Sequence, residues 1–263
     1  MNFNLILTYL NYQLTSFTEH DLHSPFVFDF YMELIKNKHP FNDFETLSAA
    51  RKDLLLNETV LTINDFGAGS KTFSHNKRKI KDITKNGIAP KKQAEFLYRL
   101  INKFKPKTIV ELGTSIGLTS MYLSLPFKKS TVYTIEGCAE TSAFSKHLFE
   151  KNAIKNIKQY HGHFNDEFPK IISEIDHLDF LYVDGNHSYE ATKTYFELAL
   201  TKKNESSIFV FDDINWSPDM QKIWKEIYLN AEVILSFDFF GIILNIDKDF
   251  YHVITPWILY SAY

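Results

Sequence analysis

The sequence KTIVELGTSIG, residues 107–117, joins a short apolar run to an acid and a turn that contains two glycines. Its β-branched residues favour a strand buried in a parallel sheet, and Gly113 and Gly117 favour a tight turn after it. The residues that follow, LTSMYLSL, predict a helix that ends before Pro126. In an open α/β sheet, ligands bind outside the carboxyl ends of the strands. We therefore expect a ligand site at this turn.

The composition predicts a globular protein with a large core. The chain has 263 residues, of which 44% are hydrophobic and 16% aromatic, which suits one large domain or one domain with an appendage. The formal net charge of -3 gives no bulk electrostatic case for binding nucleic acid or an anionic membrane. Cys138 is the only cysteine, which excludes an intramolecular disulfide and a cysteine-rich metal site.

The apolar segments of the chain do not have the features of membrane or export signals. The first residues lack a basic region and a small-residue cleavage site, so we predict no secretory signal. The longest apolar run, residues 233–246, contains Asp238 and is too short for a membrane helix. We therefore expect a cytoplasmic protein.

Strand and helix patterns alternate over the middle of the chain. We expect strands at Thr131–Ile135, Ile157–His161, Leu178–Val183 and Ser207–Phe211. Helices are expected at Glu140–Lys151, Glu167–Glu174, Ser188–Leu200 and Met220–Tyr228. This alternation predicts a parallel sheet with helices on both faces. Residues 233–237 and 240–246 are too close together for a helical crossover, so we expect an antiparallel pair at a sheet edge.

The regular pattern predicts a main domain over residues 90–263. Residues 1–64 have helical patterns, including a helix predicted to begin at Pro25, and are expected to form a helical appendage. Residues 65–89 are basic, contain glycine and lack a clear period, so we expect a connecting loop or lid. The motif DFGAG at residues 65–69 looks like a cofactor turn, but neither an apolar helix nor a second acid-ended strand follows it.

An acid stands at the end of nearly every predicted parallel strand. These acids are Glu111, Glu136, Asp184, Asp212 and Asp213. A single surface carboxylate is often only solvated, but the carboxyl ends of parallel strands meet at one edge of a sheet, so the recurrence favours a shared site. Glu136 follows the glycine turn by roughly twenty residues, where nucleotide-binding α/β folds place an acid on the ribose hydroxyls. The G-x-x-x-G spacing lacks the middle glycine of a dinucleotide turn, which weakens a dinucleotide interpretation.

Four segments together resemble the class I S-adenosylmethionine-dependent methyltransferases, in the group that includes catechol-type and macrocin-type O-methyltransferases. The segments are ELGTSIG, TIEG, DFLYVDGNHSYEAT and FVFDDI. The resemblance covers about residues 90–246 and implies a Rossmann-like α/β fold, with a seven-stranded sheet and an antiparallel last strand. It also implies the cofactor S-adenosyl-L-methionine.

The resemblance assigns the cofactor contacts residue by residue. The acid before the turn and the turn itself approach the methionine part, which selects Glu111, Gly113, Thr114, Ser115 and Gly117. Glu136 takes the ribose, and His163 and Phe164 flank the adenine.

The resemblance also implies a divalent metal site in the catechol-like branch, and Asp184, Asp212 and Asp213 match its positions. Three carboxylates suit Mg²⁺, which prefers oxygen ligands. The acidic pair departs from the Asp-Asn of the animal catechol enzymes and resembles the sugar-methylating branch more. The alternative is that Asp213 caps the next helix and Asp212 only touches cofactor or substrate.

Asp184 and His187 are the predicted catalytic residues. His187 matches the place of the basic residue that deprotonates the substrate in the catechol-like enzymes, and the unperturbed pKa of histidine lies near neutral pH. The alternative for His187 is a loop histidine that helps to cap the helix after it.

The sequence thus predicts an S-adenosylmethionine-dependent methyltransferase that methylates an oxygen of a small molecule, with or without Mg²⁺, and binds neither nucleic acid nor membrane. The N-terminal appendage would cover the substrate site or form a homodimer contact. Two alternatives stay open: an NAD(P)-dependent oxidoreductase, and a non-catalytic module that binds S-adenosylmethionine. The missing glycine argues against the first.

Overall fold

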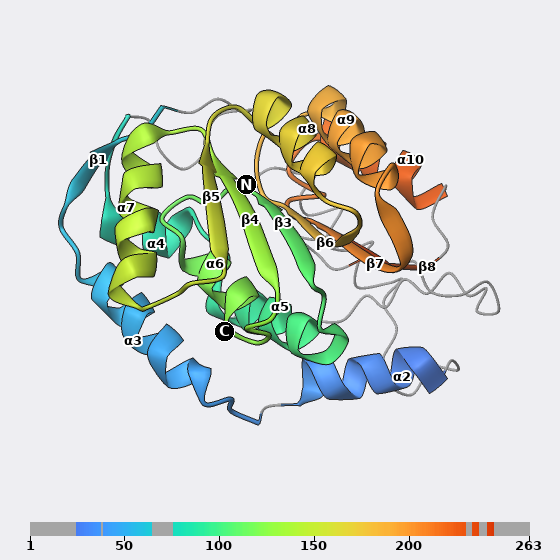
Figure 1. The fold of residues 1–263 in the computed structure, drawn as a ribbon, viewed down its shortest axis with the longest axis horizontal. Coiled ribbons are helices and arrows are strands. Elements are labelled where there is room, and N and C mark those ends of the chain that lie inside the picture. Colours follow the sequence, from blue (N-terminus) through green and yellow to red (C-terminus); the bar gives the residue numbers. More distant parts are fainter. Residues whose placement is uncertain (1–24, 38, 65–75, 230–232, 237–240, 245–263) are drawn as a thin grey trace.

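A seven-stranded sheet forms the centre of the protein (Figure 1). The computed structural model describes residues 25–37, 39–64, 76–229, 233–236 and 241–244. In spatial order the strands are β5 (Ile157–His161), β4 (Thr131–Glu136), β3 (Thr108–Leu112), β6 (Leu178–Val183), β7 (Lys203–Phe211), β9 (Gly241–Leu244) and β8 (Val233–Ser236). The first five are parallel, and β9 is antiparallel to both neighbours. The predicted α/β fold with an antiparallel last strand is confirmed.

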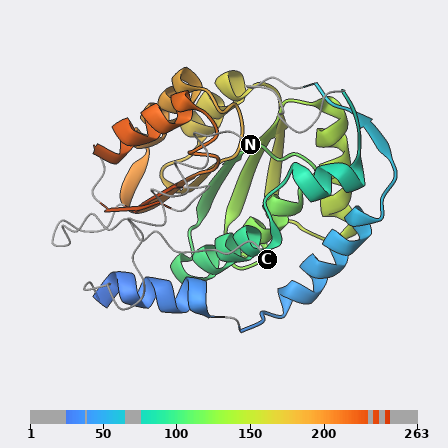
Figure 2. The same ribbon diagram turned by 180° about the vertical axis from the view of Figure 1, so that it is seen from behind.

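Helices cover both faces of this sheet. One face carries α5 (Lys91–Phe104), α6 (Leu118–Ser124) and α7 (Ala139–Lys151), and the other carries α8 (Phe164–Glu174), α9 (Tyr189–Leu200) and α10 (Pro218–Leu229). Figures 1 and 2 show α8, α9 and α10 grouped together, apart from α5. None of the described helices is both long enough and apolar enough to span a membrane.

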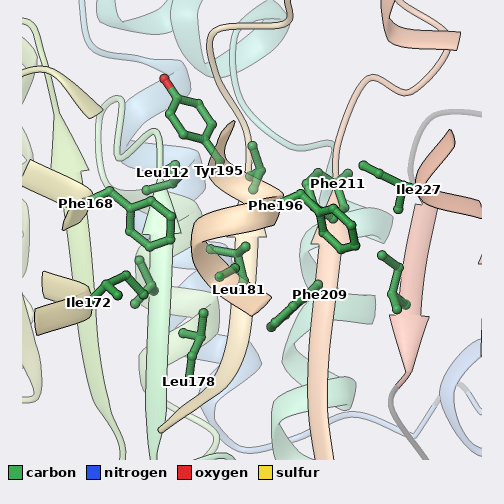
Figure 3. Packing of buried hydrophobic residues seen from close by; sticks show 14 of the residues in the cluster. Leu112, Phe168, Ile172, Leu178, Leu181, Tyr195, Phe196, Phe209, Phe211 and Ile227 are labelled. Atoms are coloured by element: carbon green, nitrogen blue, oxygen red, sulfur yellow. The ribbon is translucent and has the colours of Figure 1, made fainter. Parts of the chain in front are cut away.

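Side chains alternate along the central strands and fill the two layers between sheet and helices. Ile109, Phe180 and Val210 lie in the layer with α5, whereas Val110, Leu181 and Phe209 lie in the layer with α8, α9 and α10. Figure 3 shows the second layer from close by. A fully buried side chain of this size stabilises the fold by about 1.5–3 kcal/mol. The same period of two places Tyr182, Asp184 and Asp212 toward α5.

The basic segment before residue 90 is more ordered than the predicted loop. Its described part contains β2 (Lys77–Lys79), which pairs antiparallel with β1 (Val60–Thr62), and α4 (Ile80–Asn86). Ile80 and Ile83 are buried at helical spacing, but a helix of seven residues is too short to show a clear period. The prediction of a loop was therefore wrong over residues 77–86, and the appendage is not purely helical.

The described part of the N-terminal region packs along α5. Its helices are α2 (Pro25–Tyr31), the π-helical turn η2 (Met32–Lys36) and α3 (Asp43–Leu55). The ring centroids of Phe30 and Phe96 are 6.2 Å apart, and the Tyr98 hydroxyl donates a hydrogen bond to Asp43 at 2.7 Å. The helical pattern predicted before Pro25, the DFGAG motif and the predicted outer ends of the last two strands lie outside the described residues.

The turn after β3 brings the ends of two strands into contact. Gly113 has a φ of +113°, and a Cβ built there would lie 2.1 Å from the carbonyl oxygen of Asp184. The N–H groups of Gly113 and Thr114 donate to the carbonyl oxygen of Ile135 at 3.1 and 3.2 Å, which holds the turn against β4. Only glycine combines this φ with so close an approach. The predicted glycine turn is confirmed.

Replacing Gly113 by alanine is expected to lower the free energy of unfolding by at least about 2 kcal/mol, because the left-handed φ is costly and the new Cβ must displace Asp184. Gly87→Ala is the control, since φ is -127° there and the nearest atom to a Cβ is 3.3 Å away. Urea denaturation of both variants measures the difference. Equal stability of the two would contradict this role of Gly113.

Candidate active site

A cavity of about 550 Å³ opens at the carboxyl ends of β3, β4, β6 and β7. Nine of the predicted site residues line it: Gly113, Ser115, Glu136, His163, Phe164, Asp184, His187, Asp212 and Asp213. From the described part of the N-terminal region, only Ile63 and Asn64 reach its wall. A volume of this size is typical of small-molecule and cofactor sites.

The other three predicted residues, Glu111, Thr114 and Gly117, do not line this cavity but support its floor. The buried carboxylate of Glu111 accepts hydrogen bonds from the Ser120 hydroxyl and, at 2.6 Å, from the Thr134 hydroxyl. Thr134 in turn lies 2.5 Å from the Thr114 hydroxyl. These bonds join the end of β3 to β4 and α6, so the carboxylate holds the turn in place from below.

Gly117 permits close packing between two helices. Its φ is +87°, and a Cβ there would lie 2.8 Å from both Ser145 and Phe149 of α7. The start of α6 can therefore lie directly against α7, beneath the turn.

Burial raises the pKa of Glu111 to about 7, and repulsion from Glu136 adds to this, while the hydrogen bonds from Ser120 and Thr134 act in the opposite direction. Its Oε1 atom has no hydrogen-bond partner among the described residues. A carboxyl group with one unpartnered buried oxygen is better accommodated when it is protonated. Glu111 therefore sits at the boundary between charged and neutral forms near pH 7.

Glu136 is held at the cavity wall by the backbone. The Ser115 N–H donates to its Oε2 at 2.7 Å, and the Cys138 N–H donates to its Oε1 at 2.8 Å. Burial raises the pKa of Glu136, while these two bonds favour the charged form. A carboxylate has about four lone-pair sites, so the oriented side chain can still accept a hydrogen bond from a ligand hydroxyl.

Phe164 and Gly185 form a second part of the wall. A Cβ at Gly185 would lie 2.8 Å from the Phe164 ring, so the loop after β6 packs directly on this side chain. Phe164 is the first residue of α8, which begins three residues earlier than predicted. The ring presents a flat apolar surface to the cavity, which suits an aromatic base.

The carboxylates after β6 and β7 share one hydroxyl. The Tyr182 hydroxyl lies 2.5 Å from Oδ2 of Asp212 and 3.3 Å from Oδ2 of Asp184. Burial, followed by repulsion from Asp212 and Asp213, raises the pKa of Asp184 well above its usual range. Burial and repulsion from Asp213 raise the pKa of Asp212, while the Tyr182 hydrogen bond lowers it. Asp184 is only partly buried and faces the cavity.

His187 lies beside Asp213 and Trp216 at the cavity. Its Nε2 atom is 3.4 Å from Oδ2 of Asp213, and its ring centroid is 5.8 Å from that of Trp216. Asn186 and Asp213 have φ values of 50° and 52°, in the left-handed region. Such backbone conformations are costly for residues other than glycine and are concentrated at functional sites.

Sequence reasoning missed Gln93 and Tyr182. Tyr182 could have been found, because it lies two residues before Asp184 on a strand and so shares its face. Gln93 donates from Nε2 to Oδ2 of Asp212 at 2.6 Å, across 119 residues of sequence. No local pattern predicts that contact, because it depends on how α5 packs on the sheet.

The donor set does not fit the predicted metal site. Among the described residues, no group of three or more His, Cys, Asp or Glu side chains is arranged to hold a metal ion. Oδ2 of Asp212 already accepts bonds from Gln93 and Tyr182, and Asp213 is oriented toward His187. The structure thus brings the three carboxylates to one cavity without giving them a common centre.

The segment that builds this cavity matches a known family. Residues 110–214, from β3 to the loop after β7, match the family model of a methyltransferase domain. The predicted resemblance to methyltransferases is confirmed for this segment. No protein of curated function matches the sequence significantly.

Solved methyltransferase structures share the fold. A putative O-methyltransferase from Klebsiella pneumoniae aligns with a TM-score of 0.55 and 12% identity, over 84% of this chain and 96% of that one. An O-methyltransferase from Bacillus cereus in complex with SAH has a TM-score of 0.52 and 15% identity, over 83% and 96%. TomG from Streptomyces achromogenes, an O-methyltransferase of tomaymycin synthesis in complex with SAM, has a TM-score of 0.57 and 14% identity, over 83% and 96%.

We expect the difference in free energy of unfolding between the wild type and Glu111→Gln to depend on pH. As the pH rises from 4.5 to above 7, the wild type should lose stability relative to the variant. The folded-state pKa of Glu111 is about 7 against an ordinary value of 4.5, so the stabilising protonated form is lost over that window. The full change is on the order of 3 kcal/mol. Urea denaturation at several pH values measures it, with Glu150→Gln on the exposed side of α7 as control. A pH-independent difference would contradict the assignment.

Proposed function

We propose that this protein is an S-adenosylmethionine-dependent methyltransferase that methylates an oxygen of a small-molecule acceptor. The observation that carries the proposal is the Glu136 carboxylate, oriented by two backbone N–H groups beside the Gly113 turn. It lies at the wall of a cavity built by a segment that matches a methyltransferase domain. The O-methyltransferases that share the fold support oxygen as the acceptor atom.

Different cavity residues would bind different parts of the predicted cofactor. Glu136 would accept hydrogen bonds from the two ribose hydroxyls, and the Phe164 ring would pack on the adenine. His163 immediately precedes α8 and is exposed at the cavity wall. The backbone of Gly113 and Ser115 would lie against the methionine part. Glu111, Thr114 and Gly117 act through the turn rather than by contact.

Asp184 and His187 would face the acceptor molecule. S-adenosylmethionine, when bound, supplies an electrophilic methyl group on a sulfonium sulfur. Asp184 or His187 would take the acceptor hydroxyl proton, while the new oxygen–carbon bond would replace the carbon–sulfur bond and leave S-adenosylhomocysteine. The raised pKa of Asp184 makes its carboxylate a stronger base than an exposed one. Alignment of the two reacting atoms in the cavity supplies a further part of the rate enhancement.

Some predictions of the sequence remain proposals. They are a homodimer contact through the N-terminal region and a cytoplasmic location. The predicted Mg²⁺ ion on Asp184, Asp212 and Asp213 is not retained, because the donor set does not fit it, and no step above depends on it.

Glu136→Ala is expected to weaken the binding of S-adenosylmethionine by about 10- to 100-fold, because hydrogen bonds to a charged group contribute roughly 1.5–3 kcal/mol. Isothermal titration calorimetry measures the Kd, with Glu150→Ala as a matched control on the exposed side of α7. A wild type that does not bind S-adenosylmethionine, or that binds NADH instead in a fluorescence titration, would overturn the proposal.

Asp184→Asn is expected to lower kcat by about 100-fold without changing the Kd for S-adenosylmethionine, because an amide cannot take the acceptor proton. Release of S-adenosylhomocysteine with a panel of phenolic and sugar hydroxyl acceptors measures turnover. Asp166→Asn on the exposed side of α8 is the matched control. An unchanged kcat in Asp184→Asn would transfer the role of base to His187, which His187→Gln tests in the same assay.

A further inference from the structure

Asp212 accepts three hydrogen bonds from the protein. Its Oδ2 accepts hydrogen bonds from the Tyr182 hydroxyl at 2.5 Å and from Nε2 of Gln93 at 2.6 Å. Its Oδ1 accepts the Asp213 N–H at 2.9 Å. A carboxylate has about four lone-pair sites. Three of them are therefore used by the protein, and the side chain is only 7% exposed.

The sheet and α5 together bring these donors to Asp212. β6 and β7 pair with Tyr182 opposite Val210, so Asp212, two residues further on, lies on the same face as the tyrosine ring. α5 covers that face and begins at Lys91, which places Gln93 in its first turn, above the end of β7. The contact thus follows from the packing of a helix on a sheet, and not from a flexible surface side chain.

The other two acids are bonded differently. Asp184 receives a single side-chain hydrogen bond among the described residues, the 3.3 Å contact with Tyr182, and it keeps oxygen lone pairs toward the cavity. Asp213 points to His187 at 3.4 Å. A divalent cation bridging the three carboxylates would find one lone pair left on Asp212, because Gln93, Tyr182 and the Asp213 N–H occupy the others.

We propose that Gln93 is a positioning residue. Together with Tyr182 it orients the Asp212 carboxylate, as a bound divalent cation otherwise would, so that methyl transfer by this protein does not require a metal. The proposal rests on the proposed methyltransferase function for its catalytic part only. Asp212 then has a structural role, and Asp184 and His187 face the acceptor. Gln93 also ties the cavity wall formed by Ile88, Ala89 and Pro90 to the end of β7.

Metal binding tests the proposal without turnover. Calorimetric titration of Mn²⁺ and of Mg²⁺ into the full chain is expected to show no binding with a Kd below about 1 mM in the wild type. Gln93→Glu replaces the amide donor by a fourth carboxylate and is expected to gain Mn²⁺ binding by at least about tenfold in Kd. Mn²⁺ binding by the wild type at micromolar concentrations, lost in Asp212→Asn, would overturn the proposal whether or not S-adenosylmethionine binds.

Turnover tests the positioning role. With an acceptor identified by release of S-adenosylhomocysteine, Gln93→Leu is expected to lower kcat by about tenfold, with unchanged KM for the acceptor and unchanged Kd for S-adenosylmethionine. Gln93→Lys retains a donor and is expected to recover most of the loss. The unchanged Kd shows that the variants are folded. A wild-type kcat in Gln93→Leu, or wild-type activity abolished by EDTA and restored by Mg²⁺, would contradict the proposal.

Discussion

Backbone hydrogen bonds that continue one residue beyond the parallel strands are the contacts on which the site depends. The Asp184 N–H donates to the Leu112 carbonyl at 2.9 Å, and the Asp212 N–H donates to the Val183 carbonyl at 2.9 Å. Each bond joins the first residue after one strand to the last residue of its neighbour. The loops after these strands therefore leave the sheet at fixed positions. Gly113 allows the backbone after β3 to lie close to the carbonyl oxygen of Asp184. The site is preorganised by the sheet itself.

The concentration of acids at this edge of the sheet works against stability. Burial raises the pKa values of Glu111, Asp184 and Asp212, which means that the fold disfavours their charged forms. Hydroxyl, amide and N–H donors offset part of that cost, but one oxygen of Glu111 stays without a partner among the described residues. Apolar residues of similar volume at these positions would stabilise the fold at least as well. Carboxylates kept at such a place are characteristic of functional sites, where stability is given up for chemistry.

The sequence predicted the central sheet well because buried parallel strands have a strong and simple pattern. The runs at residues 108–112 and 178–183 are largely apolar, have an acid near or just after their ends and are followed by helices, so their order and direction could be inferred. The segment at residues 77–86 was misjudged because a three-residue strand and a seven-residue helix are shorter than the window in which a period is visible. The placement of α2 along α5 depends on contacts such as Phe30 with Phe96, which no local pattern predicts.

By itself the sequence determined the α/β fold, the glycine turn at residues 113–117 and the set of strand-end acids, because these depend on local residue type and on the period of the pattern. It could not decide which residues reach the cavity and which support it from below. Only the tertiary structure placed Glu111 beneath the turn and Gln93 on Asp212. Both contacts join elements far apart in the chain, and their geometry is set by the packing of helices on the sheet rather than by any neighbouring residue.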